Sequence, residues 1–316
     1  MRASATLTCY NHLRSKYLHC PLSMNKGIFM NGIVIIDKPA DWTSQDVVSK
    51  LRGVLHTKRI GHGGTLDPMA TGVLPVFVGR ATRGVEFFEH ARKTYEAVLR
   101  LGVTTTTEDV TGEVLEKREI FVTKEAFLAV LDQFRGEIQQ IPPMYSALKI
   151  NGQKLCDLAR KGKEVERKSR TVTIFQLECL DFSGDTARLT VTCSKGTYIR
   201  TLCKDIGQAL GCGGCMESLR RTAAGAYTID EAVPLATLVE SDDPESYLRP
   251  VDTMFAEYPA VTLTGKQVLR CRNGNSFSMD LPDGTYRAYS PEGEFLMLAK
   301  VESGVMSTVK SFFDVL

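Results

Sequence analysis

The sequence predicts an α+β protein with a mixed, largely antiparallel sheet flanked by helices and a small β-barrel at its C-terminal end. Strands and helices intermix up to about residue 240 without a regular strand–helix–strand repeat, which argues against a doubly wound fold. After residue 250, short strands follow one another between glycine turns, a pattern typical of a small barrel. The 316 residues suffice for one large domain or for a medium domain with a small one.

The individual elements follow from hydrophobic periodicity and from turn residues. β-Branched and apolar runs predict strands in the first part at 32–37, 74–78, 94–101, 171–182 and 187–193. Apolar residues at helical spacing predict helices at 44–55, 123–134 and 201–210. Ser44 is the expected cap of the first of these helices. Four short strands are expected near the end, at 261–263, 284–289, 295–301 and 305–312.

Composition divides the chain into three parts. Residues 1–30 are basic and polar without an apolar block of signal-peptide length, so we expect a disordered extension or a misassigned start. Residues 31–240 form the predicted main domain, and residues 250–316 form the barrel. The acidic, proline-containing stretch 241–250 is typical of a linker. No apolar run is long enough to predict a membrane-spanning helix, so no contact with a membrane is expected.

Charge is balanced over the whole chain but not along it. The chain has 39 Lys and Arg against 37 Asp and Glu, a formal net charge of +2. A basic segment lies between residues 147 and 171. Its basic residues are Lys149, Lys154, Arg160, Lys161, Lys163, Arg167, Lys168 and Arg170. Such a segment fits a polyanion bound at one place, and the alternative is a solvated surface helix.

Nine cysteines are scattered along the chain without a disulfide framework. This usage indicates a reducing compartment and a cytoplasmic protein. Cys212 and Cys215 form a CxxC pattern, but no second pair or histidine cluster follows at zinc-binding spacing. We therefore expect two unpaired thiols near a turn and no metal site.

The glycine-rich segment 61–68 (GHGGTLDP) contains a single carboxylate, Asp67. Its glycines permit positive φ or close backbone approach, and Pro68 stiffens the turn after the carboxylate. Such a loop can present Asp67 in a fixed direction, although an aspartate in a glycine loop can also be a turn former only. Neither phosphate-binding glycine pattern is present, so a nucleotide-binding loop is not expected.

This loop is one of several distinctive blocks that follow each other along the chain. The blocks are DKP at 37–39, GHGGTLDPMATGVLP at 61–75, KTYE at 93–96, PPMYSALK at 142–149, CSKGTYIR at 193–200 and LRRT at 219–222. Together they resemble the TruB family of tRNA pseudouridine synthases, in order and in spacing. The resemblance covers about residues 31–238 and, more loosely, the barrel. It implies a pseudouridine synthase fold, a catalytic domain at 31–240 and a PUA-like RNA-binding domain at 250–316.

The resemblance also implies three catalytic residues. Asp67 matches the family's catalytic aspartate, and Arg200 matches the arginine that pairs with it. An adjacent guanidinium is expected to lower the pKa of the carboxyl and to orient it. Tyr95 matches the tyrosine that stacks on the target base and is implicated in proton removal.

Further residues are implied in substrate binding. His62 matches a histidine that inserts into the T loop of tRNA, although Gly63 stands where threonine is common in the family. Lys38 and Pro39 match a pair that braces the active-site loop. The remaining expected substrate-binding residues are Tyr198, Lys149 and Arg220. The basic segment corresponds to an insertion, at about 143–171, that closes over the T arm.

The function implied by the resemblance is isomerisation of the T-loop uridine at conventional tRNA position 55 to pseudouridine. The target base is flipped out of the stack, and its glycosidic bond is broken and remade through carbon. Asp67 acts either as a nucleophile at the ribose or as a base at its 2′ position, and the sequence leaves both open. The reaction has no redox step, so no cofactor is expected, and neither is an obligatory protein partner.

Two other functions remain open at this point. The first is an RNA-binding protein that mainly helps tRNA to fold, with catalysis incidental. The second is the catalytic subunit of a guide-RNA ribonucleoprotein. The Asp67, Tyr95 and Arg200 set argues against the first, and the basic insertion argues against the second because it favours direct recognition of tRNA.

Overall fold

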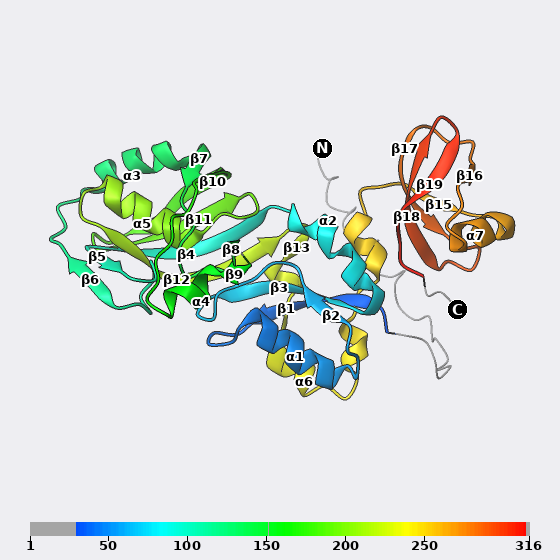
Figure 1. The fold of residues 1–316 in the computed structure, drawn as a ribbon, viewed down its shortest axis with the longest axis horizontal. Coiled ribbons are helices and arrows are strands. Elements are labelled where there is room, and N and C mark those ends of the chain that lie inside the picture. Colours follow the sequence, from blue (N-terminus) through cyan, green and yellow to red (C-terminus); the bar gives the residue numbers. More distant parts are fainter. Residues whose placement is uncertain (1–29, 151, 314–316) are drawn as a thin grey trace, which may run out of the picture.

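The computed structural model describes residues 30–150 and 152–313, and the expectation for residues 1–29 lies outside this range. Figure 1 shows a large twisted sheet with helices packed against it and a smaller β-structure at its side, formed by the C-terminal residues. Within the described range, no helix is both long and apolar enough to cross a lipid bilayer.

The large sheet has ten strands and the order β14-β1-β3-β12-β4-β11-β10-β7, with β2 paired to β3 and β13 paired to β12. Its strands are β1 (Gly32–Lys38), β2 (Ile60–His62), β3 (Thr71–Val78), β4 (Lys93–Leu101), β7 (Gly136–Gln140), β10 (Arg170–Phe182), β11 (Thr186–Cys193), β12 (Gly214–Ala224), β13 (Tyr227–Thr228) and β14 (Val233–Pro234). Most neighbours are antiparallel, whereas β1–β14 and β3–β12 are parallel. The predicted mixed, largely antiparallel sheet is confirmed.

Helices pack through their buried apolar residues, several of them on this sheet and the last one in the C-terminal region. The helices are α1 (Ser44–Val54), α2 (Val85–Glu89), α3 (Lys124–Leu131), α4 (Leu155–Ala159), α5 (Ile199–Ala209), α6 (Leu235–Val239) and α7 (Gly265–Arg272). One buried cluster joins α3 and α5 to β4, β10, β11 and β12. Another joins α1 and α6 to β1 and β3. Shorter 3-10 turns are η1 (Gly79–Gly84), η2 (Asp132–Phe134), η3 (Ile229–Glu231), η4 (Pro244–Tyr247) and η5 (Val251–Phe255).

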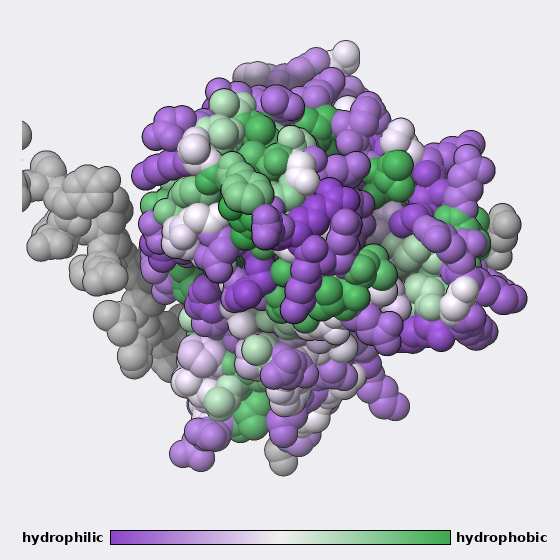
Figure 2. Space-filling model, turned by 90° about the vertical axis from the view of Figure 1, so that its left-hand side faces the viewer, coloured by the Kyte–Doolittle hydropathy of each residue, from purple (hydrophilic) through white to green (hydrophobic). Residues whose placement is uncertain are grey.

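Two small hairpins extend from the main sheet. The first is β5 (Val103–Thr105) with β6 (Val114–Lys117), and the second is β8 (Lys149–Ile150) with β9 (Gln153–Lys154). The end of the molecule near β5, β6 and α3 carries exposed apolar side chains, among them Leu115, Phe121 and Leu128. Figure 2 shows this end, where apolar residues lie between hydrophilic ones.

The C-terminal region forms a curled sheet of five strands with its own core. Its order is β15-β17-β18-β19-β16, and α7 packs beside it. The strands are β15 (Ala260–Thr262), β16 (Phe277–Ser278), β17 (Gly284–Tyr289), β18 (Phe295–Glu302) and β19 (Val305–Ser311). This half-barrel confirms the predicted β-structure, and the four expected strands lie within one or two residues of their predicted bounds.

Aromatic side chains join the half-barrel to the main domain. Phe255, Leu298 and Phe312 belong to the same buried cluster as Phe88 of α2. The Phe87 ring meets the Phe255 ring edge-on, with centroids 5.4 Å apart. The two parts of the chain therefore share a continuous apolar interface.

The stretch 241–250 differs from the expected linker. It contains the turn η4, and Arg249 exchanges two backbone hydrogen bonds with Ile33 at the start of β1, of 2.9 and 2.8 Å. The Arg249 guanidinium also pairs with Glu231 at 2.5 Å. Composition alone indicated a linker, and these contacts fix the segment to the edge of the main sheet.

Candidate active site

The loop that carries Asp67 runs from the end of β2 to the start of β3 and is held on both sides of the aspartate. Ser44 is not the cap of α1; Thr43 is, and its side chain accepts a hydrogen bond from Asp46 N. Ser44 is buried instead, and its Oγ accepts a 2.8 Å hydrogen bond from Leu66 N. On the other side of Asp67, the Pro68 carbonyl accepts a 3.1 Å hydrogen bond from Lys38 Nζ.

Lys38 is fully buried and supports the loop from behind. Its ammonium also donates to the carbonyls of Pro39, at 2.7 Å, and Trp42, at 2.6 Å. Burial lowers the pKa of Lys38 to about 8, so the ammonium form still prevails at neutral pH. Because the side chain has no exposed surface, Lys38 fits the bracing role rather than a direct contact with substrate.

The Asp67 carboxylate lies in a cavity of about 970 Å³ that is open to solvent. Segments far apart in the sequence line this cavity. They are 41–43, 64–69, 89–95, 107–111, 145–160, 194–200 and 219–221, with gaps. The cavity thus collects Asp67, Tyr95, Tyr198 and Arg200, four of the residues that the sequence singled out.

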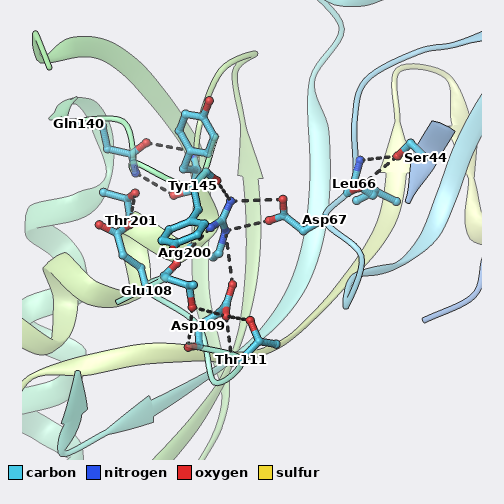
Figure 3. Close-up of polar contacts among 12 residues, drawn as sticks. Ser44, Leu66, Asp67, Glu108, Asp109, Thr111, Gln140, Tyr145, Arg200 and Thr201 are labelled. Atoms are coloured by element: carbon cyan, nitrogen blue, oxygen red, sulfur yellow. Dashed lines mark hydrogen bonds and ion pairs between the residues drawn. The ribbon is translucent and has the colours of Figure 1, made fainter. Parts of the chain in front are cut away.

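Arg200 pairs with Asp67 through two contacts. Arg200 Nε lies 2.8 Å from Asp67 Oδ2, and Nη2 donates to Oδ1 at 3.2 Å. Arg200 lies in the first turn of α5 and is almost completely buried. Its remaining donors bond the carbonyls of Thr107, at 3.1 Å, and Tyr145, at 2.8 Å. Figure 3 shows the guanidinium held between these groups and facing the carboxylate.

A second carboxylate, that of Asp109, lies on the other side of Arg200. Its Oδ2 is 3.8 Å from Arg200 Nε, and it is buried. Asp109 Oδ1 accepts hydrogen bonds from Thr107 Oγ1, at 2.7 Å, and from the backbone and hydroxyl of Thr111, at 3.0 and 2.5 Å (Figure 3). Sequence reasoning missed Asp109, although an Asp in the threonine-rich run 104–111 of a loop was a usable signal.

Burial raises the pKa of the Asp67 carboxyl above its ordinary value. The Arg200 guanidinium lowers this pKa, and Asp109 raises it further, but the loss of hydration at the floor of the cavity is the largest effect. About a third of the Asp67 side chain remains accessible, through the cavity alone. The arginine lowers the pKa of the carboxyl as expected, but burial outweighs this effect and the pKa is raised overall.

Tyr95 and Tyr198 face the cavity from two different elements. Tyr95 lies on β4 and is buried against the floor, and burial raises the pKa of its hydroxyl. Tyr198 precedes α5, and its backbone N–H and carbonyl each bond the buried side chain of Gln140 at 3.0 Å. The Arg170 guanidinium lies over the Tyr198 ring at 4.8 Å.

Besides Lys38 and Pro39, three further expected binding residues do not line the cavity. His62 ends β2 with a buried Nδ1 that has no hydrogen-bond partner among the described residues, and burial lowers its pKa. Lys149 is exposed on β8. Arg220 donates to both carboxylate oxygens of Asp37, at 3.2 and 2.8 Å. Its neighbour Arg221 lines the cavity instead, because consecutive residues of a strand point to opposite faces.

Gly63 is required by its neighbours in this structure. A Cβ at this position would lie 2.6 Å from the ring of Phe88 and 2.9 Å from that of Phe77. The space that a threonine would occupy is therefore filled by an aromatic ring of α2.

Lys93 is a cavity residue to which the sequence assigned no role. It is buried, and its ammonium donates to the carbonyl of Glu89 at 3.0 Å. Burial lowers its pKa to about 8.

No group of three or more His, Cys, Asp or Glu side chains in residues 30–150 and 152–313 is arranged to hold a metal ion. Within the same ranges, Cys212 and Cys215 are buried free thiols.

Comparison with known proteins matches two family models to the main domain. Residues 52–199 match the TruB family pseudouridylate synthase N-terminal domain, and residues 200–256 match the tRNA pseudouridylate synthase B C-terminal domain. The tRNA pseudouridine synthase B of Clostridium kluyveri is 42% identical over 289 residues, which cover 90% of this chain and 100% of that protein. The chain belongs to the TruB family of pseudouridylate synthases.

Other relatives support this TruB membership. The tRNA pseudouridine synthase B of Dechloromonas aromatica is 48% identical over 252 residues, covering 79% of this chain and 84% of that protein. A chain of a Cbf5-Nop10-Gar1 complex superimposes with a TM-score of 0.68 and 26% identity, covering 90% of this chain and 86% of the other. The same fold occurs in an H/ACA RNP bound to a substrate RNA containing 2′-deoxyuridine, with a TM-score of 0.67 and 24% identity. The predicted pseudouridine synthase fold is confirmed.

Proposed function

We propose that this TruB-family chain isomerises the T-loop uridine of tRNA, at conventional position 55, to pseudouridine. The observation that carries the proposal is the Asp67 carboxylate, held by two contacts to the buried Arg200 at the floor of an open cavity. The relatives named tRNA pseudouridine synthase B support tRNA as the substrate. The domain division at 31–240 and 250–316, and a cytoplasmic location without an obligatory protein partner, belong to the same proposal.

The proposed reaction breaks the bond between N1 of uracil and C1′ of ribose and forms a bond between C5 and C1′. The proton on C5 leaves to solvent, and N1 gains a proton, so the atoms balance. Asp67 takes part either as a nucleophile at C1′ or as a base at the 2′ position, and both roles require the ionised carboxylate. Arg200 orients it through the two parallel contacts.

Tyr95 is proposed as the aromatic face on which the flipped uracil rests. Its ring borders the cavity beside Asp67, and flipped bases are commonly held by stacking on aromatic side chains. Burial raises the pKa of its hydroxyl, and the proposed role uses the face of the ring. His62, neutral and partly exposed near the loop, is proposed to fill the gap that the displaced nucleotide leaves.

Basic side chains around the cavity are proposed to hold the T-arm backbone. Lys154 and Arg160 of the insertion line one side, with the exposed Lys149 beyond them. On the other side, Lys195 lines the cavity and Arg92 stacks on Phe175 at 4.0 Å. Such contacts neutralise phosphates and set the register of the RNA rather than read its bases. The half-barrel is proposed as a PUA-like RNA-binding domain.

The test is release of tritium from an unmodified tRNA transcript that carries 5-tritiated uridine. Wild type should release one tritium per tRNA, and Asp67→Asn should release none while it still binds tRNA within a few-fold of wild-type affinity. Release by both proteins would show that Asp67 is not the catalytic group. No release by either, with binding intact, would favour a folding role or a requirement for a guide RNA.

A further inference from the structure

Arg221 lies directly under the Asp67 loop, and the mechanism above does not use it. It belongs to β12 and is among the largest fully buried side chains. Its Nε donates to the carbonyl of Val73 at 2.6 Å, and its Nη2 donates to the carbonyl of Gly64 at 3.1 Å. Gly64 lies in the loop before Asp67, and Val73 lies near the start of β3, the strand that follows the loop, so one guanidinium joins the loop to this strand.

The backbone of Arg221 contacts the same loop. In the parallel pairing of β12 with β3, Arg221 lies opposite Gly72. A Cβ at Gly72 would lie only 2.2 Å from the Arg221 carbonyl oxygen, and Gly72 has a φ of +100°. Glycine is needed here both for the conformation and for the close approach. Arg221 therefore fixes the end of the loop through its main chain as well as its side chain.

The Arg221 guanidinium also lies beside Tyr95, which lines the same cavity. Its positive charge and a hydrogen bond lower the pKa of the Tyr95 hydroxyl, although burial outweighs both. The same charge lowers the pKa of Lys38 and Lys93, which places Arg221 within electrostatic reach of both buried lysines.

We propose that Arg221 is a positioning residue for the isomerisation: by joining Gly64 and Val73 it sets the orientation of the Asp67 carboxylate toward the ribose. This inference rests on the proposed function. The planar fork of an arginine places two donors on two separate carbonyls, whereas the single ammonium of a lysine cannot reproduce that geometry. Asp67 itself makes no contact with Arg221, so the effect passes through the loop backbone.

The experiment compares Arg221→Lys and Arg221→Met with wild type and with Arg135→Met. Arg135 is a matched control because it also donates to a backbone carbonyl, that of Leu177 at 3.1 and 2.8 Å, but is exposed and lies outside the cavity. The measurements are the single-turnover rate at saturating tRNA, the tRNA dissociation constant by filter binding, and thermal unfolding.

A loss of rate without a loss of affinity is the expected result. Arg221→Met should lower the rate about 100-fold and Arg221→Lys about 10-fold, because a misplaced reacting group costs about this much. Both variants should keep the wild-type dissociation constant, and Arg135→Met should keep the wild-type rate. If Arg221→Met does not fold, the folded Arg221→Lys variant decides.

A wild-type rate in a folded Arg221 variant would overturn the inference, as would a rate loss fully explained by weaker tRNA binding. Release of tritium by the wild type separates this outcome from failure of the proposed function. An inactive wild type argues against the proposed function, whereas an active wild type with an equally active Arg221 variant argues against the positioning role alone.

Discussion

The floor and the rim of the cavity both carry basic residues but use them in opposite ways. Arg200 and Arg221 on the floor and Lys38 behind it are buried, and each donates to two or more backbone carbonyls. At the rim, Lys195 lines the cavity and Arg92 is the neighbour of the cavity residue Lys93; both Arg92 and Lys195 are exposed. Their contacts are an aromatic face and the ring nitrogen of His90, with no backbone carbonyl among them.

This difference shows that buried and exposed positive charges serve two purposes in and around this cavity. A buried cation bonded to carbonyls cannot move without leaving polar groups unpaired, so it fixes geometry. An exposed cation adapts to its partner and contributes salt-dependent affinity. Substitutions on the floor should therefore change the rate, and substitutions on the rim should change binding.

The largest effect is expected for Arg200→Met. Removal of the guanidinium leaves Asp67 and Asp109 without their common counter-ion and raises the pKa of Asp67 further. We expect the single-turnover rate to fall by about 1000-fold, as for loss of a preorganised electrostatic group. The rate should recover in part as the pH rises, because the carboxyl then ionises, and a pH-independent loss would contradict this account.

The second effect concerns the brace behind the loop. Lys38→Met leaves three carbonyls without a donor, at about 1 kcal/mol each. We expect a loss of about 3 kcal/mol in the free energy of unfolding, measured by urea denaturation, and a lower rate with unchanged tRNA affinity. Unchanged stability would show that water replaces the ammonium and that the brace is dispensable.

The third effect is the pH dependence of the wild-type rate at saturating tRNA. Because the folded protein raises the pKa of Asp67, protonation should remove activity at a pH above the ordinary aspartate value of 3.8. On the alkaline side, Lys38 and Lys93 lose protons near pH 8, and Lys38 then has one donor fewer for its three carbonyls. The alkaline decline should persist in Lys93→Met if Lys38 causes it.

The smallest effect is expected on the rim. Arg92→Gln should leave the saturating rate unchanged and reduce the slope of log affinity against log salt by about one, as for one lost phosphate contact. Arg118→Gln is the matched control, because Arg118 is exposed and pairs with Glu116 at 2.7 Å but, unlike Arg92, has no sequence neighbour that lines the cavity. Equal slopes for the two variants would show that Arg92 does not contact the RNA backbone.

Much of the fold was predictable because its elements have clear periodicity. Every second residue of β4 is buried and those between are less so, and α3 begins after a threonine that caps it. The central strand β12 was not predicted. Its register shifts between Met216 and Ser218 and again between Arg221 and Ala223, and these bulges interrupt the alternation that would have identified a strand.

The same irregularity explains the incomplete site prediction. Without β12 as a strand, nothing in the sequence distinguished Arg220 from Arg221, although the two point to opposite faces. Asp67 and Arg200 were identifiable because each lies in a distinctive block. The position of Asp109 in the site could not be inferred from the sequence, because it depends on a contact with Arg200, which lies far away in the chain.

The five residues of α2 carry a consequence for how this protein can evolve. Phe87 packs on Phe255 at the half-barrel interface, and the next residue, Phe88, fills the space beside Gly63. A hybrid that joined a foreign RNA-binding domain at residue 250 would leave the Phe87 ring in water and loosen the helix that abuts the Asp67 loop. Exchange of the C-terminal domain between lineages therefore requires simultaneous change in α2, so the two should be inherited together.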